Sequence, residues 1–238
     1  SYQENTIPYI NKMQFQNITY SYPLSREMQL KDISLTISQG QFIGIIGKSG
    51  SGKSTFLNIL LGLLNRNSGE IIINDKIVNT KDSWSSSIGY VPQDIVLFDQ
   101  PLKNNIAFGL LDKDINIPRI NQVIDMANLN EVVAALDGGI DTMLGEKGVK
   151  LSGGQIQRIG IARALYDDPS ILVFDEATSA LDRQTELEVL DAINALKGVK
   201  TMIMITHRID TVKRCDYVYK FSDGLILEEG LPSEINLE

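Results

Sequence analysis

The sequence has 238 residues, and its 43% of hydrophobic side chains can fill the core of one large domain or two small ones. The formal net charge of −8 argues against nucleic acid as a partner, because clustered Lys and Arg drive such binding. The single cysteine, Cys215, excludes an internal disulfide, and neither a signal peptide nor an apolar run of about 20 residues is present. We therefore expect a globular protein in a reducing, cytoplasmic setting.

The N-terminal third is predicted to form strands around one helix. Residues 1–12 are polar and are predicted to be a linker arm. Apolar and polar residues alternate over 13–22 and 30–37, which indicates half-buried antiparallel strands. The uninterrupted apolar run 42–46 indicates a strand covered on both faces, and helical spacing follows over 55–64.

The rest of the chain alternates between strands and helices. The predicted strands are 70–74, 88–92, 171–174 and 201–205, and the predicted helices are 102–108, 117–135, 155–166 and 185–196. Fully apolar strands that alternate with helices indicate an α/β fold with a mainly parallel sheet. An antiparallel N-terminal β-subdomain and an inserted α-helical subdomain are expected to flank it.

The segment GKSGSGKS, which begins at Gly47, matches the P-loop pattern and lies between a buried strand and a helix. Gly50 and Gly52 let the loop curl, so that backbone N–H groups converge on phosphate oxygens at a helix N-terminus. Lys53 is expected to reach the β- and γ-phosphates, and Ser54 to ligate Mg²⁺. The other expected nucleotide contacts are Ser49, Ser51 and Thr55. A Gly/Ser-rich surface turn is the alternative, and the flanking strand and helix argue against it.

Two adjacent carboxylates, Asp175 and Glu176, follow four apolar residues of a predicted strand. The C-terminal end of such a strand faces the ligand in parallel sheets. Asp175 is therefore expected to bind Mg²⁺ through water, and Glu176 to orient or deprotonate the attacking water. Acidic residues also occupy strand ends for structural reasons, but a neighbouring P-loop favours the functional interpretation.

The segment LSGGQ, residues 151–155, is similar to the signature sequence of the ABC family, and the residues that follow it also match. Ser152 and Gln155 have the spacing of a capping box, so the segment could simply begin a helix. Gly153 and Gly154, however, are poor helix formers that cost up to about 1 kcal/mol each. Our interpretation is that they allow the backbone to approach an anion closely.

The resemblance implies roles for four more residues. Tyr22 resembles the aromatic residue that stacks on adenine, although a tyrosine at a strand end can also belong to the core. Gln93 resembles the glutamine that contacts Mg²⁺ and links the site to the helical subdomain. Asp182 ends a segment that resembles the D-loop, which crosses to a partner subunit. His207, the only histidine, resembles the residue that contacts the γ-phosphate; a lone histidine is otherwise usually unremarkable.

The resemblance also implies ATP and Mg²⁺ as cofactors and a second copy of the chain as partner. In this family two ATP molecules are sandwiched in a head-to-tail dimer, so Ser152 and Gly154 are expected to act on the partner's nucleotide. ATP binding closes the dimer and hydrolysis releases it. Motion is expected to pass to a membrane partner near residues 93–99.

Two segments resemble the exporter branch: 102–109 (LKNNIAFG) and 145–148 (GEKG). The implied function is ATP hydrolysis that powers an exporter or flippase, with a lipid-linked oligosaccharide flippase as one candidate. A transmembrane domain, normally on the same polypeptide, would place the chain at the cytoplasmic side of the inner membrane.

The expected organisation is a linker over 1–12 and an ABC ATPase domain over 13–238. Residues 13–94 and 166–230 are expected to form the catalytic core, and residues 95–165 the helical subdomain.

The main alternative is a soluble ABC-type mechanical ATPase of DNA repair or translation. The DNA-repair type inserts a long coiled coil between P-loop and signature, whereas this sequence has no sustained heptad pattern. The ribosome-associated type usually carries two cassettes, whereas this sequence has one. A small-molecule kinase with a P-loop leaves the signature and His207 unexplained.

Overall fold

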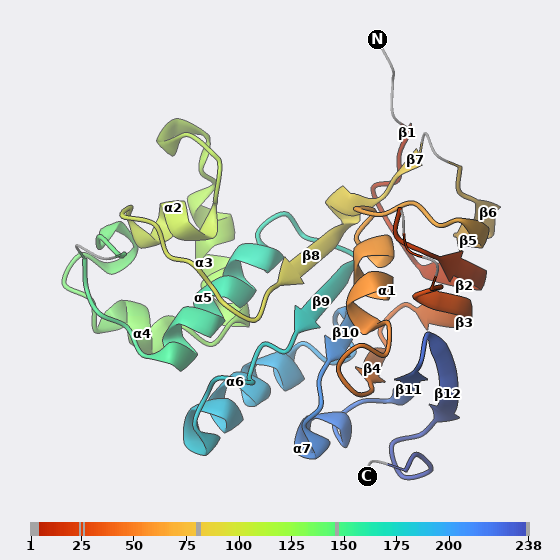
Figure 1. The fold of residues 1–238 in the computed structure, drawn as a ribbon. Coiled ribbons are helices and arrows are strands. Elements are labelled where there is room, and N and C mark those ends of the chain that lie inside the picture. The colour runs from red at the N-terminus through yellow and green to blue at the C-terminus, as the bar shows by residue number, and fades with distance from the viewer. Residues whose placement is uncertain (1–4, 24, 26, 80–81, 146–147, 237–238) are drawn as a thin grey trace. The chain divides into compact units, whose positions relative to one another are not determined.

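The chain packs into two units, each assembled from segments that are distant in sequence (Figure 1). The computed structural model describes residues 5–23, 25, 27–79, 82–145 and 148–236. Unit 1 comprises Ser1–Ile88, Ser170–Val173 and Lys197–Glu238, and unit 2 comprises Gly89–Pro169 and Phe174–Leu196. The α/β fold class expected from the sequence is confirmed.

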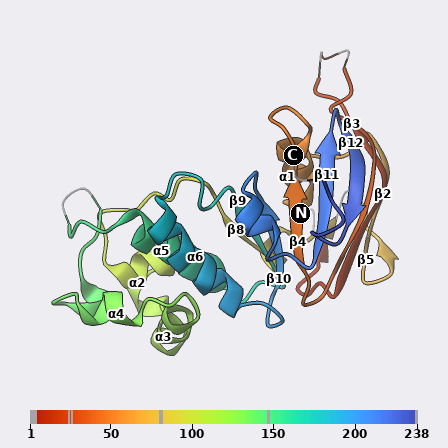
Figure 2. The same cartoon turned by 90° about the horizontal axis from the view of Figure 1, so that it is seen from below.

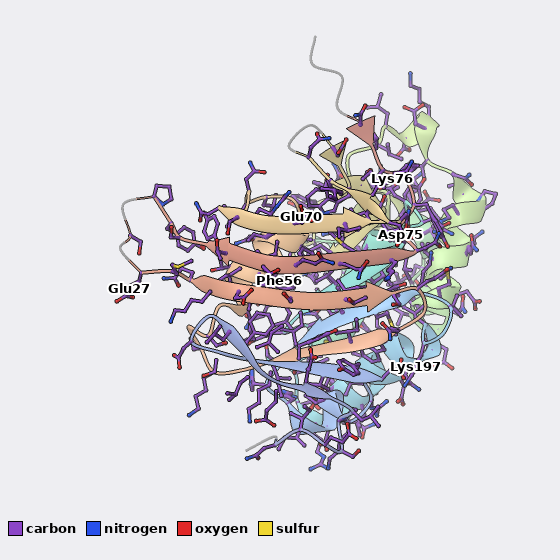
Figure 3. All side chains as sticks on the ribbon, turned by 90° about the vertical axis from the view of Figure 1, so that its right-hand side faces the viewer. Glu27, Phe56, Glu70, Asp75, Lys76 and Lys197 are labelled. Carbon is purple, nitrogen blue, oxygen red and sulfur yellow. The ribbon has the colours of Figure 1, made fainter. Side chains whose placement is uncertain are left out.

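Unit 1 contains an antiparallel sheet with the strand order β3-β2-β5-β6. Its strands are β2 (Lys12–Tyr20), β3 (Leu30–Ser38), β5 (Ser68–Ile73) and β6 (Lys76–Ile77). Figure 3 shows this sheet with Glu70 on β5 and with Asp75 and Lys76 at the turn into β6. Met13 and Phe15 on β2 are fully buried, as the alternating pattern predicts.

A six-stranded sheet has the order β12-β11-β4-β10-β9-β8. Its strands are β4 (Phe42–Ile46), β8 (Ile88–Val91), β9 (Ile171–Asp175), β10 (Thr201–Ile205), β11 (Tyr217–Ser222) and β12 (Leu225–Gly230). Strand β4 pairs in parallel with β10 and β11, while β11 and β12 form an antiparallel hairpin. The sequence-based expectations did not include this hairpin, which turns at Asp223 and Gly224, both with positive φ.

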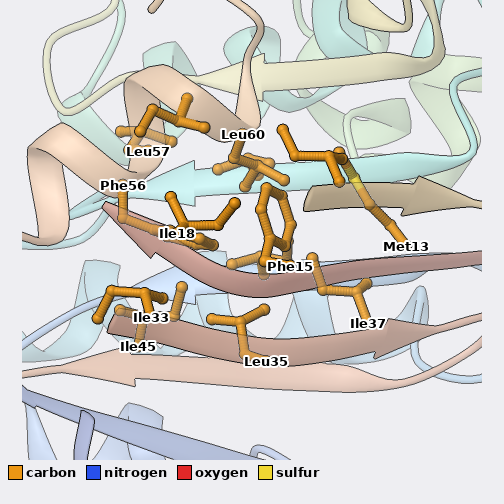
Figure 4. Close-up of a cluster of buried hydrophobic side chains, with 14 of the residues drawn as sticks. Met13, Phe15, Ile18, Ile33, Leu35, Ile37, Ile45, Phe56, Leu57 and Leu60 are labelled. Atoms are coloured by element: carbon orange, nitrogen blue, oxygen red, sulfur yellow. The ribbon is translucent and has the colours of Figure 1, made fainter. Parts of the chain in front are cut away.

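The buried side chains of helix α1 (Lys53–Leu60) belong to one hydrophobic cluster in unit 1. Strands of the antiparallel sheet and of the six-stranded sheet contribute the other members of this cluster. The ring of Phe56 lies 4.9 Å from that of Phe15 on β2 and 5.6 Å from that of Phe221 on β11. Figure 4 shows Phe56, Leu57 and Leu60 among the buried side chains of β2 and β3, and Figure 2 shows β2, β3 and β12 as neighbouring strands. This packing fixes the start of α1, and hence the end of the P-loop. The short helix α7 (Ile209–Val212) also belongs to unit 1.

Unit 2 is mainly helical. Its helices are α2 (Leu102–Ile106), α3 (Ile117–Met126), α4 (Asn130–Ala134), α5 (Gly153–Leu165) and α6 (Arg183–Ala195). The single helix expected over 117–135 is wrong, because the chain breaks between α3 and α4. Asn128 has a φ of 54° just past the end of α3, a left-handed conformation that commonly ends helices.

Unit 2 also takes in residues 174–196, which the expected helical subdomain over 95–165 leaves out. Helix α6 lies beside α5, and this packing draws the segment into unit 2 (Figure 2). Among the described residues, no helix is long and apolar enough to span a membrane.

The N-terminal segment is packed rather than extended as a linker. Strand β1 (Asn5–Thr6) pairs in parallel with β7 (Asp82–Ser83). Ile10 is buried, and its backbone N–H donates a 3.0 Å hydrogen bond to Ser170 Oγ. The described part of segment 1–12 therefore belongs to the structure of unit 1.

Candidate nucleotide site

The loop between β4 and α1 has a backbone that depends on glycine. Gly47, Gly50 and Gly52 have φ values of 146°, 78° and 104°, which other residues rarely adopt. A Cβ on Gly47 would lie 2.3 Å from the carbonyl oxygen of Phe221, so no side chain fits there. These three positive φ values produce the curl that the sequence pattern predicts for a phosphate-binding loop.

Lys53, the first residue of α1, lies inside this loop. Its Nζ donates hydrogen bonds to the carbonyl oxygens of Gly47 (2.6 Å) and Lys48 (2.9 Å), and Ser51 Oγ is 3.4 Å away. Lys53, Ser51 and Thr55 are buried, whereas the Ser54 side chain is exposed. A buried ammonium group at a helix N-terminus with an adjacent exposed hydroxyl fits a phosphate and its Mg²⁺.

A cavity of about 650 Å³ borders the loop on residues 47–51. His207, which follows β10, lines the same cavity, as do Ser222 and Asp223 of the turn between β11 and β12. His207 thus lies in the cavity that borders the loop.

Tyr22 lies beside the first turn of α1. Its hydroxyl is 3.4 Å from Thr55 Oγ1, and its ring packs edge-on against Tyr20 at 5.1 Å. Because 41% of Tyr22 is exposed, its ring is available to an aromatic ligand, whereas Tyr20 is the buried member of the pair.

Asp175 is the last residue of strand β9, and Glu176 follows it. Oδ2 of Asp175 accepts a 3.1 Å hydrogen bond from the Tyr90 hydroxyl on β8. Burial, the charge of Asp175 and this hydrogen bond raise the pKa of Tyr90 to about 12, so the phenol stays protonated at neutral pH. Glu176 has a φ of 47°, a conformation that is costly for a residue with a side chain and that clusters at functional sites.

Gln93 lies just beyond β8 with an exposed side chain. Its backbone carbonyl accepts a 2.7 Å hydrogen bond from Nε2 of Gln157, a buried residue on α5. The backbone of the Gln93 loop is thereby fixed to the helix that follows the signature segment.

The signature segment forms the start of α5, and the capping box is confirmed. Ser152 Oγ accepts from the backbone N–H of Gln155 (3.2 Å), and Gln155 Oε1 accepts from that of Ser152 (2.9 Å). Ser152 and Gly153 are exposed, but Gly154 is buried, and a Cβ on it would lie 2.4 Å from Thr185 Cγ2. Close packing against Thr185 therefore also requires glycine at position 154. The sequence had suggested only approach to an anion as the reason.

Asp182 is the N-cap of α6. Its Oδ1 accepts from the backbone N–H groups of Gln184 (3.1 Å) and Thr185 (3.2 Å), and its Oδ2 accepts from Thr185 Oγ1 (2.6 Å). These bonds lower the pKa of Asp182, with the Thr185 side chain as the largest cause. Capping by Asp182 was not expected, although aspartate is a preferred N-cap residue.

The site residues expected from the sequence thus fall into two groups. Unit 1 holds the P-loop, Tyr22 and His207, and unit 2 holds Gln93, the signature segment, Asp175, Glu176 and Asp182. Sequence reasoning gave no role to Tyr90 or Thr185, whose contacts depend on the packing of neighbouring strands and helices. For Tyr90, the available signal was its position on a strand that leads to Gln93.

A surface near residues 93–99 exposes aromatic rings. Phe98 and Phe108 stack at 4.8 Å between ring centroids, and the guanidinium of Arg163 lies within 5.9 Å and 5.6 Å of them. Val96 beside them is 61% exposed. Of the exporter-like segment 145–148, residues 146–147 lie outside the described residues.

The chain is similar to known proteins in sequence and in fold. Residues 30–179 match the family model described as "ABC transporter". The chain is 39% identical over 228 residues to "ABC transporter B family member 21" of Arabidopsis thaliana, covering 94% of this chain and 17% of the relative. It is 37% identical over 230 residues to the "ATP-dependent lipid A-core flippase" of Bordetella avium, covering 96% and 39%.

A solved structure, "Structure of a bacterial Atm1-family ABC exporter with ATP bound", is similar with a TM-score of 0.83 and 32% identity. The match covers 97% of this chain and 40% of the other. The chain therefore spans two fifths or less of the length of these relatives.

Proposed function

The chain belongs to the ABC transporter family, and from this premise we propose that it is the ATP-binding and ATP-hydrolysing domain of an exporter or flippase. The observation that carries this proposal is a glycine-dependent loop around Lys53, in a chain that also has a capped signature helix. ATP is the nucleotide implied by membership of the family. Mg²⁺ suits the oxygen ligands offered by Ser54, Gln93 and Asp175.

The proposed catalytic group comprises Glu176, His207, Gln93 and Lys53. Glu176 orients or deprotonates the attacking water, and the strained backbone at this residue supports a functional role. Lys53 and the N–H groups at the start of α1 stabilise charge on the phosphates. His207, in the cavity that borders the loop, contacts the γ-phosphate. Bound Mg²⁺ neutralises charge on the phosphate oxygens.

Nucleotide binding by two copies of the chain completes the proposed site. Ser152 and Gly154 of one copy contact the γ-phosphate held by the P-loop of the other, so ATP joins the two copies. Two exposed residues at the start of α5, Ser152 and Gly153, support this arrangement. Hydrolysis removes the bridge and lets the dimer open.

Coupling to a membrane domain is proposed through the surface formed by Val96, Phe98 and Phe108. Exposed aromatic and aliphatic side chains are typical of protein contact surfaces. The membrane domain lies on the same polypeptide, which places this chain at the cytoplasmic side of the membrane.

Export or flipping is the proposed direction of transport, because one relative is named a lipid A-core flippase and the solved structure is named an exporter. A lipid-linked substrate fits these names. A soluble mechanical ATPase is not favoured, since the similar proteins are named as a transporter, a flippase and an exporter.

The proposal is tested by Glu176→Gln. We expect the variant to bind ATP, to lose nearly all hydrolysis and to accumulate an ATP-stabilised dimer on size-exclusion chromatography. Glu131→Gln, on the exposed face of α4, is the matched control and retains activity. Hydrolysis at the native rate by Glu176→Gln would remove this residue from the mechanism.

Shared sites are tested by mixing Lys53→Ala and Ser152→Ala proteins. A mixed dimer contains one site with an intact P-loop and an intact signature, so we expect part of the turnover to return. No recovery at any mixing ratio would contradict the head-to-tail arrangement.

A further inference from the structure

We propose that Thr185 is a positioning residue that locks the signature segment to the loop before α6, through the contact between its methyl group and Gly154. This inference rests on the proposed function, which puts the start of α5 on the partner's nucleotide. It assigns a role to a residue that lies outside the signature and the P-loop.

The contact between the two segments leaves no room for a side chain. A Cβ on Gly154 would lie 2.4 Å from Thr185 Cγ2 and 3.7 Å from Thr185 Cβ. A Cβ on Gly153 would lie 3.0 Å from Leu181 Cδ2. Both missing side chains of the signature thus face residues 181–185 of the same chain. At Gly154, α5 approaches the first turn of α6 more closely than a residue with a side chain allows.

Thr185 cannot easily move its methyl group away. Its hydroxyl donates a 2.6 Å hydrogen bond to Asp182 Oδ2, and its backbone N–H donates to Oδ1 of the same carboxylate. A threonine in a helix divides between two rotamers, and the hydrogen bond from this hydroxyl to Asp182 selects one of them. The methyl group is therefore fixed against Gly154.

A second bond ties the loop to α6: Thr178 Oγ1 donates to Glu186 Oε1 at 3.3 Å. Residues 178–182 are thus held at both ends by the first turn of α6. The same turn contacts the start of α5 through Thr185. A shift of this loop that carries Thr185 with it therefore changes the contact with Gly154.

The consequence concerns the partner's nucleotide. The proposed function requires Ser152 and Gly154 to reach the γ-phosphate held by another copy of the chain. The contact between Thr185 and Gly154 keeps the signature segment in one position relative to residues 178–182. Both segments would therefore meet the partner copy as one rigid surface. Thr185 acts through Gly154, without touching the nucleotide.

The test separates the methyl group of Thr185 from its hydroxyl. Gly154→Ala is expected to lower ATP turnover at least about tenfold, because the added methyl group meets Thr185 Cγ2. Adding Thr185→Ser removes that methyl group and keeps the hydroxyl, so the double variant should recover to within about threefold of native turnover. Adding Thr185→Val instead keeps a branched side chain and removes the hydroxyl, and it should give no recovery.

A readout without nucleotide keeps this inference separate from the proposed function. In urea unfolding, Gly154→Ala should lower the midpoint, and Thr185→Ser should restore more than about half of the loss. Absence of this coupling overturns the packing contact. If Thr185→Ser restores the urea midpoint of Gly154→Ala but not its ATP turnover, the positioning role is overturned. If Glu176→Gln hydrolyses ATP at the native rate while the stability coupling is observed, the proposed function alone is overturned.

Discussion

The hydroxyl of Tyr90 donates a 3.1 Å hydrogen bond to Oδ2 of Asp175, joining the neighbouring strands β8 and β9 at the proposed magnesium side of the site. This hydrogen bond restricts rotation of the Asp175 carboxylate and so fixes the direction of its other oxygen, Oδ1. The same strand β8 leads, two residues after Val91, to Gln93, so one strand serves both proposed magnesium contacts.

Tyr90→Phe is predicted to raise the Mg²⁺ concentration for half-maximal ATP hydrolysis by about threefold to tenfold, because Asp175 loses an orienting bond. The ring stays in place, so the free energy of unfolding should change by no more than about 1.5 kcal/mol. Magnesium titrations of turnover and of nucleotide binding measure the effect. Tyr9→Phe, which removes a hydroxyl bonded to Gln39, is the control and should leave the magnesium dependence unchanged.

Gly47→Ala and Gly50→Ala form a matched pair within the P-loop. A methyl group on Gly47 meets the carbonyl oxygen of Phe221, whereas one on Gly50 meets nothing within 4 Å. We expect Gly47→Ala to lower the free energy of unfolding by about 2 to 4 kcal/mol, and Gly50→Ala by about 1 kcal/mol through its positive φ alone. Urea unfolding measures both, and equal losses would contradict the contact with Phe221.

Asp182 gives a prediction for acidic pH. Its lowered folded-state pKa means that its bonds stabilise the fold above its ordinary pKa of 3.8, and that this stability is lost as pH falls through the folded-state value. Asp182→Ala should lower the melting temperature at neutral pH by about 2 to 4 °C, while Asp182→Asn, which retains an N-cap, should lower it less. Below the folded-state pKa, the advantage of native protein over Asp182→Asn should disappear.

Cys215 is predicted to be unreactive in the folded protein. Burial raises the pKa of its thiol to about 12, so the thiolate fraction near neutral pH is far smaller than for an ordinary thiol. Alkylation by iodoacetamide should be correspondingly slow in buffer and fast in unfolding concentrations of urea. Rapid alkylation of native protein would contradict the burial of this side chain.

The sequence predicted the curl of the loop before Lys53, the position of Asp175 and Glu176 at the end of a strand and the capping box, because each depends on residues that are close in the chain. The strongly apolar strands β4 and β10 were also predicted, with the same ends as in the structure. Here the local pattern and the tertiary structure impose the same conformation.

Other features could not be predicted because they depend on contacts between distant segments. The clash that requires glycine at position 154 exists only once Thr185 lies beside it. The bond from Tyr90 to Asp175 likewise requires β8 and β9 to be neighbours. By contrast, two features have local sequence signals. Asp223-Gly224 is an Asp-Gly pair, which is typical of a hairpin turn, and Asn128 is a residue type that often adopts the left-handed conformation past a helix end.

The packed N-terminal segment has a mechanical consequence. The carbonyl of Ile7 accepts a hydrogen bond from Ser87 Oγ, and the N–H of Ile10 donates one to Ser170 Oγ. Ser87 and Ser170 each directly precede a strand, β8 and β9 respectively. Tension applied to the chain at Thr6 would therefore be borne where β8 and β9 begin, and these are the two strands that carry Tyr90 and Asp175.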